Sequence, residues 1–172
     1  MKKNNIILTG MPASGKSTLG VVLAKTAGMF FLDTDLMIQG ATGRLLQEII
    51  DKDGMEEFLR IEEEVLVRVK AENAVIATGG SAIYSERGMK HLQSIGRIVY
   101  LELPLEEIQR RLKNIKTRGI AMNPGENLED LYQKRIPLYE KYADLTLRTL
   151  GLSLEESVEA FLELNQKEKN ES

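Results

Sequence analysis

The sequence predicts one α/β domain in which helices cover both faces of a parallel β-sheet. Short apolar runs at residues 6–8, 29–32, 74–78, 98–101 and 145–147 alternate with segments in which apolar residues recur at helical spacing. Strands that alternate with helices are typical of parallel sheets covered on both faces. The length of 172 residues fits a single domain, and a domain of this size needs no disulfide or structural metal to be stable.

The composition argues against several classes of binding partner. The chain has no Cys, which excludes disulfides and Cys-ligated metals, and its net charge of −3 includes no long block of one sign. A general nucleic-acid surface or an anionic-membrane surface is therefore not indicated. The apolar run at residues 6–8 is too short for a signal peptide or a membrane span. We expect a cytoplasmic monomer that binds small molecules.

The first strand runs into a glycine-rich loop that fits a phosphate-binding motif. Residues 10–17 read Gly-Met-Pro-Ala-Ser-Gly-Lys-Ser, which matches G-x-x-x-x-G-K-[S/T] at every defined position, and a helical pattern follows. Gly10 and Gly15 let backbone N–H groups approach phosphate oxygens, and the helix N-terminus favours the same anion. Lys16 would reach the β- and γ-phosphates, and the Ser17 hydroxyl would ligate Mg²⁺.

Two carboxylates follow the second predicted strand. Asp33 and Asp35 lie where the carboxyl end of a strand in an open α/β sheet meets its ligands. Asp33 could hold Mg²⁺ directly or through water, and Asp35 could orient an acceptor hydroxyl and take its proton. The alternative for either residue is the N-cap of the helix that follows.

Local signals place the remaining helices. A turn is expected at residues 40–43, a short helix at 45–50, and a longer helix that opens with a capping box at 53–56 and ends near residue 70. Further helices are expected at 86–94, from residue 104 to about residue 112, at 128–142 with a kink or restart at Pro137, and at 153–164 behind a second capping box. The polar residues 165–172 are expected to fray.

Several residues outside the glycine loop are candidate ligands. Gly79 and Gly80 end the third strand and allow a ligand to approach the backbone, although a plain turn explains them equally well. Arg60 and Glu63 are neighbours on their helix and by themselves indicate a surface ion pair. Arg135 is a candidate anion ligand, and the single His, at position 91, is assigned no role.

The stretch 110–118 carries five basic residues and no acid, and residues 119–125 contain two Gly and a Pro. A basic, mobile segment late in a phosphate-binding domain indicates a lid that closes over the nucleotide and adds positive charge near the transferred phosphoryl group. The alternative is a solvated run of charges.

These segments together resemble the shikimate kinase family, within the nucleoside-monophosphate-kinase-like group of P-loop enzymes. The resemblance runs from residue 6 to about residue 147 and rests on residues 10–18, 31–35, 58–63, 76–80 and 135–139. It implies a three-layer P-loop kinase fold with strand order 2-3-1-4-5. It also implies transfer of the ATP γ-phosphate to the 3-hydroxyl of shikimate, a step of aromatic amino-acid biosynthesis, with Mg²⁺ as cofactor.

On the acceptor side, the resemblance implies that Asp35 holds the substrate hydroxyls and serves as base. Arg60 and Arg135 would grip the substrate carboxylate, each as a planar two-pronged ligand if they meet across a pocket. Gly79 and Gly80 would donate backbone N–H groups to the substrate.

On the nucleotide side, the resemblance implies that Asp33 and Ser17 serve the metal, that Arg111 lies beside adenine and that Arg118 is the lid arginine. Lys16, Asp35 and Arg118 are the implied catalytic residues. The implied ATP contacts are Gly10, Met11, Pro12, Ala13, Ser14, Gly15, Lys16, Ser17, Thr18, Arg111 and Arg118. Residues 1–172 would form one domain with a core at 4–164, a substrate-binding insert at about 34–62, a lid at about 112–126 and a tail at 165–172.

Two departures from the family pattern lie near the acceptor and the lid. Ser81 stands where the family usually has a third glycine, and the lid reads Arg118-Gly-Ile-Ala121 where the family usually has Arg-Pro-Leu-Leu. They motivate an alternative, a kinase of the same fold that acts on another small hydroxy acid such as gluconate. A GTPase switch ranks low because the Asn-Lys-x-Asp motif is absent, and a nucleotide-binding regulatory module without turnover is the third alternative.

Overall fold

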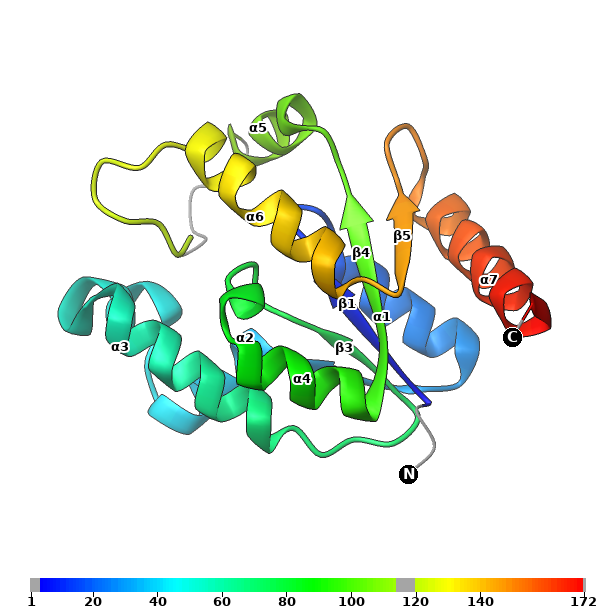
Figure 1. Cartoon of the computed structure of the whole chain (residues 1–172), viewed down its shortest axis with the longest axis horizontal. Coiled ribbons are helices and arrows are strands. Elements are labelled where there is room, and N and C mark those ends of the chain that lie inside the picture. The colour runs from blue at the N-terminus through cyan, green and yellow to red at the C-terminus, as the bar shows by residue number, and fades with distance from the viewer. Residues whose placement is uncertain (1–3, 114–119, 172) are drawn as a thin grey trace.

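The computed structural model describes residues 4–113 and 120–171 as a five-stranded parallel sheet with helices on both faces (Figure 1). The strand order β2-β3-β1-β4-β5 confirms the predicted fold and order, and all four pairings are parallel. The strands are β1 (Asn5–Thr9), β2 (Phe30–Asp33), β3 (Ala74–Ala77), β4 (Gly96–Glu102) and β5 (Leu145–Arg148).

The helices follow the strands in the order that the sequence predicts. They are α1 (Lys16–Ala27), α2 (Thr34–Thr42), α3 (Leu46–Arg68), α4 (Glu86–Ile95), α5 (Leu105–Lys113), α6 (Leu128–Tyr142) and α7 (Leu154–Glu171), with a 3₁₀ turn, η1 (Ala82–Tyr84), before α4. Across the described ranges, no helix combines the length and apolar character that a membrane crossing requires.

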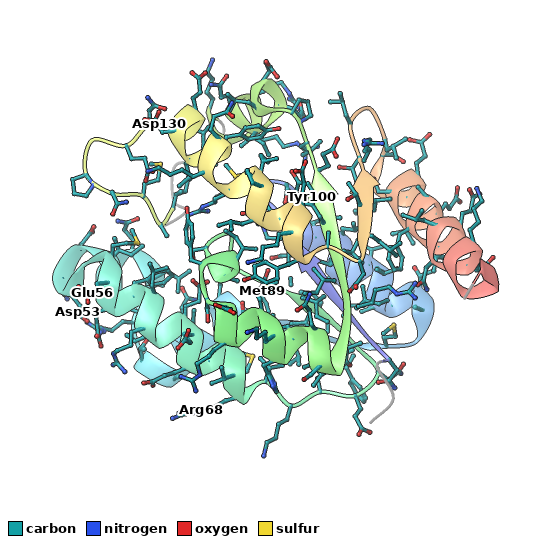
Figure 2. All side chains as sticks on the ribbon, in the orientation of Figure 1. Asp53, Glu56, Arg68, Met89, Tyr100 and Asp130 are labelled. Atoms are coloured by element: carbon teal, nitrogen blue, oxygen red, sulfur yellow. The ribbon has the colours of Figure 1, made fainter. Side chains whose placement is uncertain are left out.

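Alternation along the strands builds two cores, one on each face of the sheet. Ile7 of β1 belongs to the cluster under α3, α4 and α6, whereas its neighbours Ile6 and Leu8 belong to the cluster under α1 and α7. On β4, Tyr100 points toward α6 and stacks on Tyr139, with ring centroids 5.2 Å apart (Figure 2). Both faces of the central strands are therefore buried, as a parallel sheet requires.

A third, smaller apolar cluster lies beside the sheet. Ile38 of α2 and Ile49 and Phe58 of α3 are buried together, and Ala121 packs against them. The cluster gives α2 and the first half of α3 a core of their own next to the carboxyl ends of the strands.

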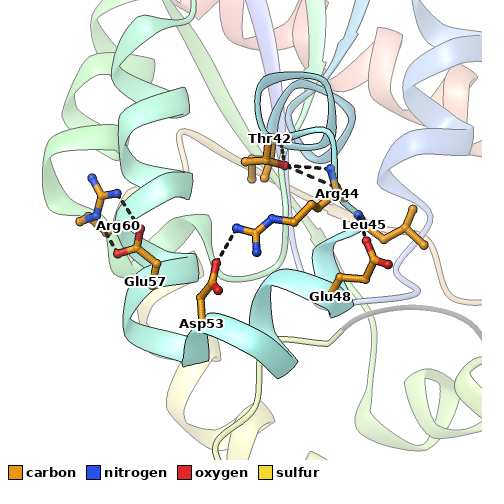
Figure 3. Close-up of polar contacts among 8 residues, drawn as sticks. Thr42, Arg44, Leu45, Glu48, Asp53, Glu57 and Arg60 are labelled. Carbon is orange, nitrogen blue, oxygen red and sulfur yellow. Dashed lines mark hydrogen bonds and ion pairs between the residues drawn. The ribbon is translucent and has the colours of Figure 1, made fainter.

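The structure corrects several predicted boundaries. α2 continues through the predicted turn to Thr42 and ends at Gly43, which has a φ of 67°. The two predicted helices at 45–50 and 53–70 are both present within α3, which is kinked at the non-helical Gly54 (φ 85°, ψ 170°) and ends at Arg68 instead of near residue 70. Asp53, the predicted cap, instead binds the Arg44 guanidinium (Figure 3).

The other two corrections concern the last helices. Of the kink or restart predicted at Pro137, the restart is wrong, because α6 passes through it as one helix. Arg135 and Tyr139 on either side are buried. α7 does not stop at residue 164 but runs to Glu171, and the Asn165 side chain accepts a hydrogen bond from Arg97 at 3.1 Å. The Ser153–Glu156 capping box is confirmed by reciprocal bonds of 2.6 and 3.1 Å.

Asn5 is a buried polar residue at the start of the central strand. Its Nδ2 donates to the carbonyl oxygens of Ala71 at 2.7 Å and Ile95 at 2.9 Å, and its Oδ1 accepts from the Ala74 N–H at 2.9 Å. One side chain thus satisfies backbone groups at the entrances to β3 and β4, the two strands that pair with β1.

We predict that Asn5→Ala lowers the free energy of unfolding by about 2–4 kcal/mol, because it leaves buried backbone groups without partners. Asn4→Ala, at the exposed neighbouring position, is the matched control and should change stability by less than about 0.5 kcal/mol. Urea denaturation measures both values, and equal stability of the two variants would contradict the assigned role of Asn5.

Candidate active site

The loop between β1 and α1 has the geometry that the glycine motif predicts. Gly15 has a φ of 91°, and a Cβ on Gly10 (φ 148°) would lie 2.8 Å from the Leu101 carbonyl oxygen and 2.9 Å from Ser14 Oγ. Neither position accepts a larger side chain without strain, which explains the residue type at both. The loop leads directly into α1, whose N-terminal N–H groups form an anion-binding end.

Lys16 is buried against this loop. Its Nζ donates to the carbonyl oxygens of Gly10 and Met11, both at 2.9 Å, and lies 3.5 Å from Ser14 Oγ. The ammonium group is thereby held inside the curve of the loop, at the wall of the cavity described below. It lies where the motif predicts a contact to the β- and γ-phosphates.

Asp33 caps α2, and it also lies beside Ser17, where the sequence predicts a metal site. Its Oδ1 accepts from the Asp35 N–H at 2.9 Å and so caps α2, while its Oδ2 accepts from Ser17 Oγ at 2.7 Å. A hydroxyl and a carboxylate side by side are hard oxygen ligands that fit Mg²⁺. Within residues 4–113 and 120–171 no group of three or more His, Cys, Asp or Glu could hold a metal, so phosphates and water would complete this site.

One cavity of about 330 Å³ joins the phosphate loop to the second half of the chain. It opens at the carboxyl ends of the strands, where open α/β sheets bind ligands. Its lining includes three residues of the phosphate loop, both carboxylates and the loop after β3; in chain order the polar members are Lys16, Ser17, Asp33, Asp35, Gln39, Gln47, Thr78, Ser81 and Arg135. The sequence-predicted donor and acceptor residues therefore meet in one place, with the exceptions given next.

Arg135 lies at this cavity with its side chain buried in α6. Its Nη2 donates to the Ala121 carbonyl oxygen at 2.6 Å, its Nε to Tyr84 Oη at 3.2 Å, and its guanidinium lies 5.3 Å from the centre of the Tyr84 ring. Among the ion pairs of the described residues none involves Arg135. A buried guanidinium without a carboxylate is a strong candidate ligand for an anion.

Arg60 does not meet Arg135. Its guanidinium binds Glu57 on the outer face of α3 (Figure 3). It also binds Glu64, and 57% of the Arg60 side chain is exposed. The carboxylates, Glu57 above all, raise the pKa of Arg60. Arg60 lines a separate hollow of about 220 Å³, which shares Ser81 but not Arg135 with the main cavity. The pairing that the resemblance implied is therefore absent from this structure.

The loop after β3 lies close to its neighbours. The Gly79 N–H, predicted to donate to the substrate, donates to Thr34 Oγ1 at 3.2 Å, and the Gly80 carbonyl oxygen accepts from Tyr139 Oη at 2.6 Å. A Cβ on Gly80 would lie 2.8 Å from Arg135 Nη1. Both glycines thus allow close approach, here of protein side chains, and the Gly79 N–H is bonded within the protein itself.

A second pocket of about 220 Å³ lies on the other side of the phosphate loop. Arg111 lines it and donates from Nη1 to the Ala13 carbonyl oxygen at 3.2 Å, next to Gly15, Thr18 and the loop after β5. Thr149 also lines this pocket, with an Oγ1 that has no hydrogen-bond partner among the described residues. Arg118, the predicted lid arginine, lies outside the described residues.

Sequence reasoning missed Glu62 as a site residue. Glu62 is fully buried in α3, and its Oε2 accepts a 2.6 Å hydrogen bond from Ser81 Oγ. Burial disfavours the anion and raises the pKa of the Glu62 carboxyl to about 7, with Asp35 acting in the same direction and Ser81 and Arg135 opposing it. The signal that could have found it is its spacing of four residues from Phe58, which puts both on one helix face.

Comparison with known proteins finds relatives of a single kinase family. The family model described as Shikimate kinase matches residues 12–166. The chain is 39% identical to the shikimate kinase of Thermodesulfovibrio yellowstonii over 161 residues, 92% of each chain. It is 38% identical to that of Haemophilus influenzae over 152 residues, 86% of this chain and 84% of that protein.

Solved structures give the same result. A shikimate kinase from Acinetobacter baumannii in complex with shikimate superposes with a TM-score of 0.81 at 35% identity, covering 98% of this chain and 96% of that one. The shikimate kinase of Aquifex aeolicus superposes with a TM-score of 0.80 at 30% identity over 96% and 98% of the two chains. A gluconokinase from Sinorhizobium meliloti, at 15% identity and a TM-score of 0.53, shares the fold alone.

The two roles of Asp33 can be separated by substitution. Asp33→Asn keeps an oxygen that caps α2 but loses the charge beside Ser17, so we expect stability near that of the wild type and an affinity for Mg²⁺·ATP about tenfold lower. Asp33→Ala should lose the same affinity and about 1 kcal/mol of stability as well. Calorimetric titration with Mg²⁺·ATP and urea denaturation measure the two effects, and unchanged Mg²⁺·ATP affinity in Asp33→Asn would refute the metal role.

Proposed function

The chain belongs to the shikimate kinase family, and we propose that it transfers the γ-phosphoryl group of ATP to the 3-hydroxyl of shikimate. The product is shikimate 3-phosphate, so the enzyme serves the shikimate pathway of aromatic amino-acid biosynthesis. We further propose that it acts as a monomer in the cytoplasm with Mg²⁺ as the metal.

One observation carries this proposal: a single cavity joins the phosphate loop to Asp35 and to the buried Arg135. Donor and acceptor sites must adjoin for in-line transfer, since phosphoryl transfer depends on positioning and charge stabilisation more than on covalent help. Arg135 gives the acceptor end a positive charge that matches a carboxylate, and shikimate carries both a carboxylate and the hydroxyl to be phosphorylated. The shikimate bound to the Acinetobacter baumannii relative supports the same acceptor.

On the donor side, the backbone of residues 10–18 would cradle the phosphates and Lys16 would contact the β- and γ-phosphates. Ser17 and Asp33 would hold Mg²⁺, which when bound neutralises charge on the phosphate oxygens. The adenine would occupy the pocket beside Arg111, on the far side of the loop from the acceptor cavity. Arg118 would add charge from the lid, which we assign to residues 112–126.

On the acceptor side, Asp35 would accept the proton of the attacking hydroxyl and hold it in line with the γ-phosphate. Arg135 would hold the acceptor carboxylate, with Tyr84 fixing the guanidinium from the other side. We assign no carboxylate contact to Arg60, because binding there would require its release from Glu57 and Glu64. The segment at 34–62 would form the wall over the acceptor.

The test of the proposed function is ADP release with ATP and Mg²⁺ in the presence of shikimate, gluconate, quinate or no acceptor. We expect release that depends on shikimate, with a product whose phosphate is on the 3-hydroxyl by NMR. Turnover with gluconate or quinate instead of shikimate would reassign the acceptor, and tight ATP binding without any product would favour a regulatory module.

Asp35→Asn tests whether Asp35 serves as the base. It keeps the size and one oxygen of the side chain but cannot take the proton, so we predict a kcat for shikimate lower by about a hundredfold or more. The KM for ATP should stay near the wild-type value, because Asp35 lies at the acceptor end. A change confined to the KM for shikimate would show that Asp35 binds the acceptor without serving as base.

Arg135→Ala and Arg60→Ala form a matched pair for the carboxylate. Arg135→Ala should raise the KM for shikimate by about a hundredfold, whereas Arg60→Ala should raise it by less than about threefold, because its partners lie on the outer face of α3. Steady-state kinetics measures both, with thermal melting to exclude unfolding. An equally large effect of Arg60→Ala would show that Arg60 moves into the cavity when shikimate binds.

A further inference from the structure

Three ionisable side chains converge on the two glycines that follow β3. A Cβ on Gly79 would lie 2.6 Å from Glu62 Oε1 and 2.7 Å from Asp35 Oδ1, and a Cβ on Gly80 would lie 2.8 Å from Arg135 Nη1. These groups come from α3, α2 and α6. Because the glycines carry no side chains, Glu62, Asp35 and Arg135 can lie close together.

Glu62 is buried behind Ser81, which fixes its carboxyl by a hydrogen bond. Only 2% of it is exposed, Ser81 Oγ donates to its Oε2 at 2.6 Å, and its Oε1 has no hydrogen-bond partner in the described part of the chain. A buried carboxylate with one hydrogen bond is costly, whereas the protonated carboxyl needs no compensating charge. Ser81 lines the cavity itself, so the Glu62–Ser81 pair forms part of the wall.

We propose that Glu62, fixed by Ser81, is a positioning residue that keeps the acceptor site cationic by holding a proton while a carboxylate acceptor is bound to Arg135. An ionised Glu62 would offset the charge of Arg135 and repel the acceptor carboxylate. This inference rests on the proposed function, since it names what sets the affinity of that site for its acceptor.

The groups that face Glu62 determine the pH at which its carboxyl ionises. Asp35 faces it from α2 and disfavours the anion, Arg135 faces it from α6 and favours the anion, and Ser81 favours it from the loop after β3. Tyr139 of α6 also faces Glu62, and burial keeps the pKa of the Tyr139 hydroxyl far above neutrality, so this group stays uncharged. With the pKa of Glu62 raised to about 7, the carboxyl is neutral below this value and anionic above it.

Ser81, which stands where the family usually has a third glycine, lowers the pKa of Glu62. A hydroxyl that donates to Glu62 stabilises the anion, so its removal should raise the pKa of Glu62 further and extend the neutral form to higher pH. Removing the Ser81 hydroxyl should therefore shift the pH at which Glu62 ionises, whereas Glu62→Gln should abolish this ionisation, which gives the test two variants with different expected pH profiles.

The experiment measures the KM for shikimate and the KM for ATP from about pH 6 to about pH 9 in four proteins: wild type, Glu62→Gln, Ser81→Ala and Glu63→Gln. In the wild type the KM for shikimate should rise about tenfold across this range, while the KM for ATP changes little. Glu62→Gln resembles the protonated carboxyl and should keep the low KM for shikimate throughout. Ser81→Ala should move the rise to higher pH.

Glu63→Gln is the matched control, because Glu63 is the adjacent residue on α3 but binds Ser85 and Arg87 outside the cavity. It should follow the wild-type profile. Identical pH profiles of shikimate KM in the wild type and Glu62→Gln would overturn the inference even if Glu62→Gln is fully active. If Glu62→Gln does not fold, an unshifted profile in Ser81→Ala overturns it instead. Absence of shikimate turnover by the wild type at every pH would contradict the proposed function, and with it this inference.

Discussion

The buried charge of Arg135 is the constraint on which the acceptor side of this protein depends. A guanidinium taken out of water requires hydrogen-bond acceptors, and here Tyr84 and the Ala121 carbonyl oxygen supply them without cancelling the charge. The protein therefore retains a positive charge in its interior that an anionic ligand can neutralise. Burial also removes Arg135 from the screening that weakens surface arginines such as Arg60.

The parallel sheet connects this charge to the phosphate loop. Because β1, β2 and β3 are adjacent and parallel, the loop after β1, the carboxylates after β2 and the glycines after β3 all emerge at the same edge. Residues that are far apart in the sequence thus line one cavity, because each of these lies at the end of a strand or shortly after it. Asp33 reinforces the arrangement, since one carboxylate both caps α2 and binds Ser17 of the phosphate-loop helix.

The nucleotide side could be predicted from the sequence because its signals are local. The phosphate loop is specified by residues within one short segment, and the parallel fold by the alternation of strands and helices. The family resemblance supplied the strand order, which the structure confirms. Of the two alternatives for Asp33, the structure confirms the N-cap, and the metal role stays a prediction.

The acceptor side was less predictable because it depends on which way each helix faces. α3 buries Phe58, Glu62 and Leu66, which recur every four residues, so Arg60, two positions from Phe58, faces away from them. The apolar residues Ile61 and Val65, by contrast, are only partly buried. Glu62, a polar residue on the buried face, was overlooked. For Arg60 the sequence by itself indicated a surface ion pair, which agrees with its exposed position, and only the family resemblance assigned it to the acceptor.

The central claim is that the charge of a buried Arg135 selects a carboxylate acceptor. The most direct measurement compares kcat/KM for shikimate with that for its methyl ester, which keeps every hydroxyl and loses only the charge. The account predicts that the wild type prefers shikimate by about a hundredfold and that the preference largely disappears in Arg135→Gln. Equal use of the acid and its ester by the wild type, or an unchanged preference in Arg135→Gln, would contradict it.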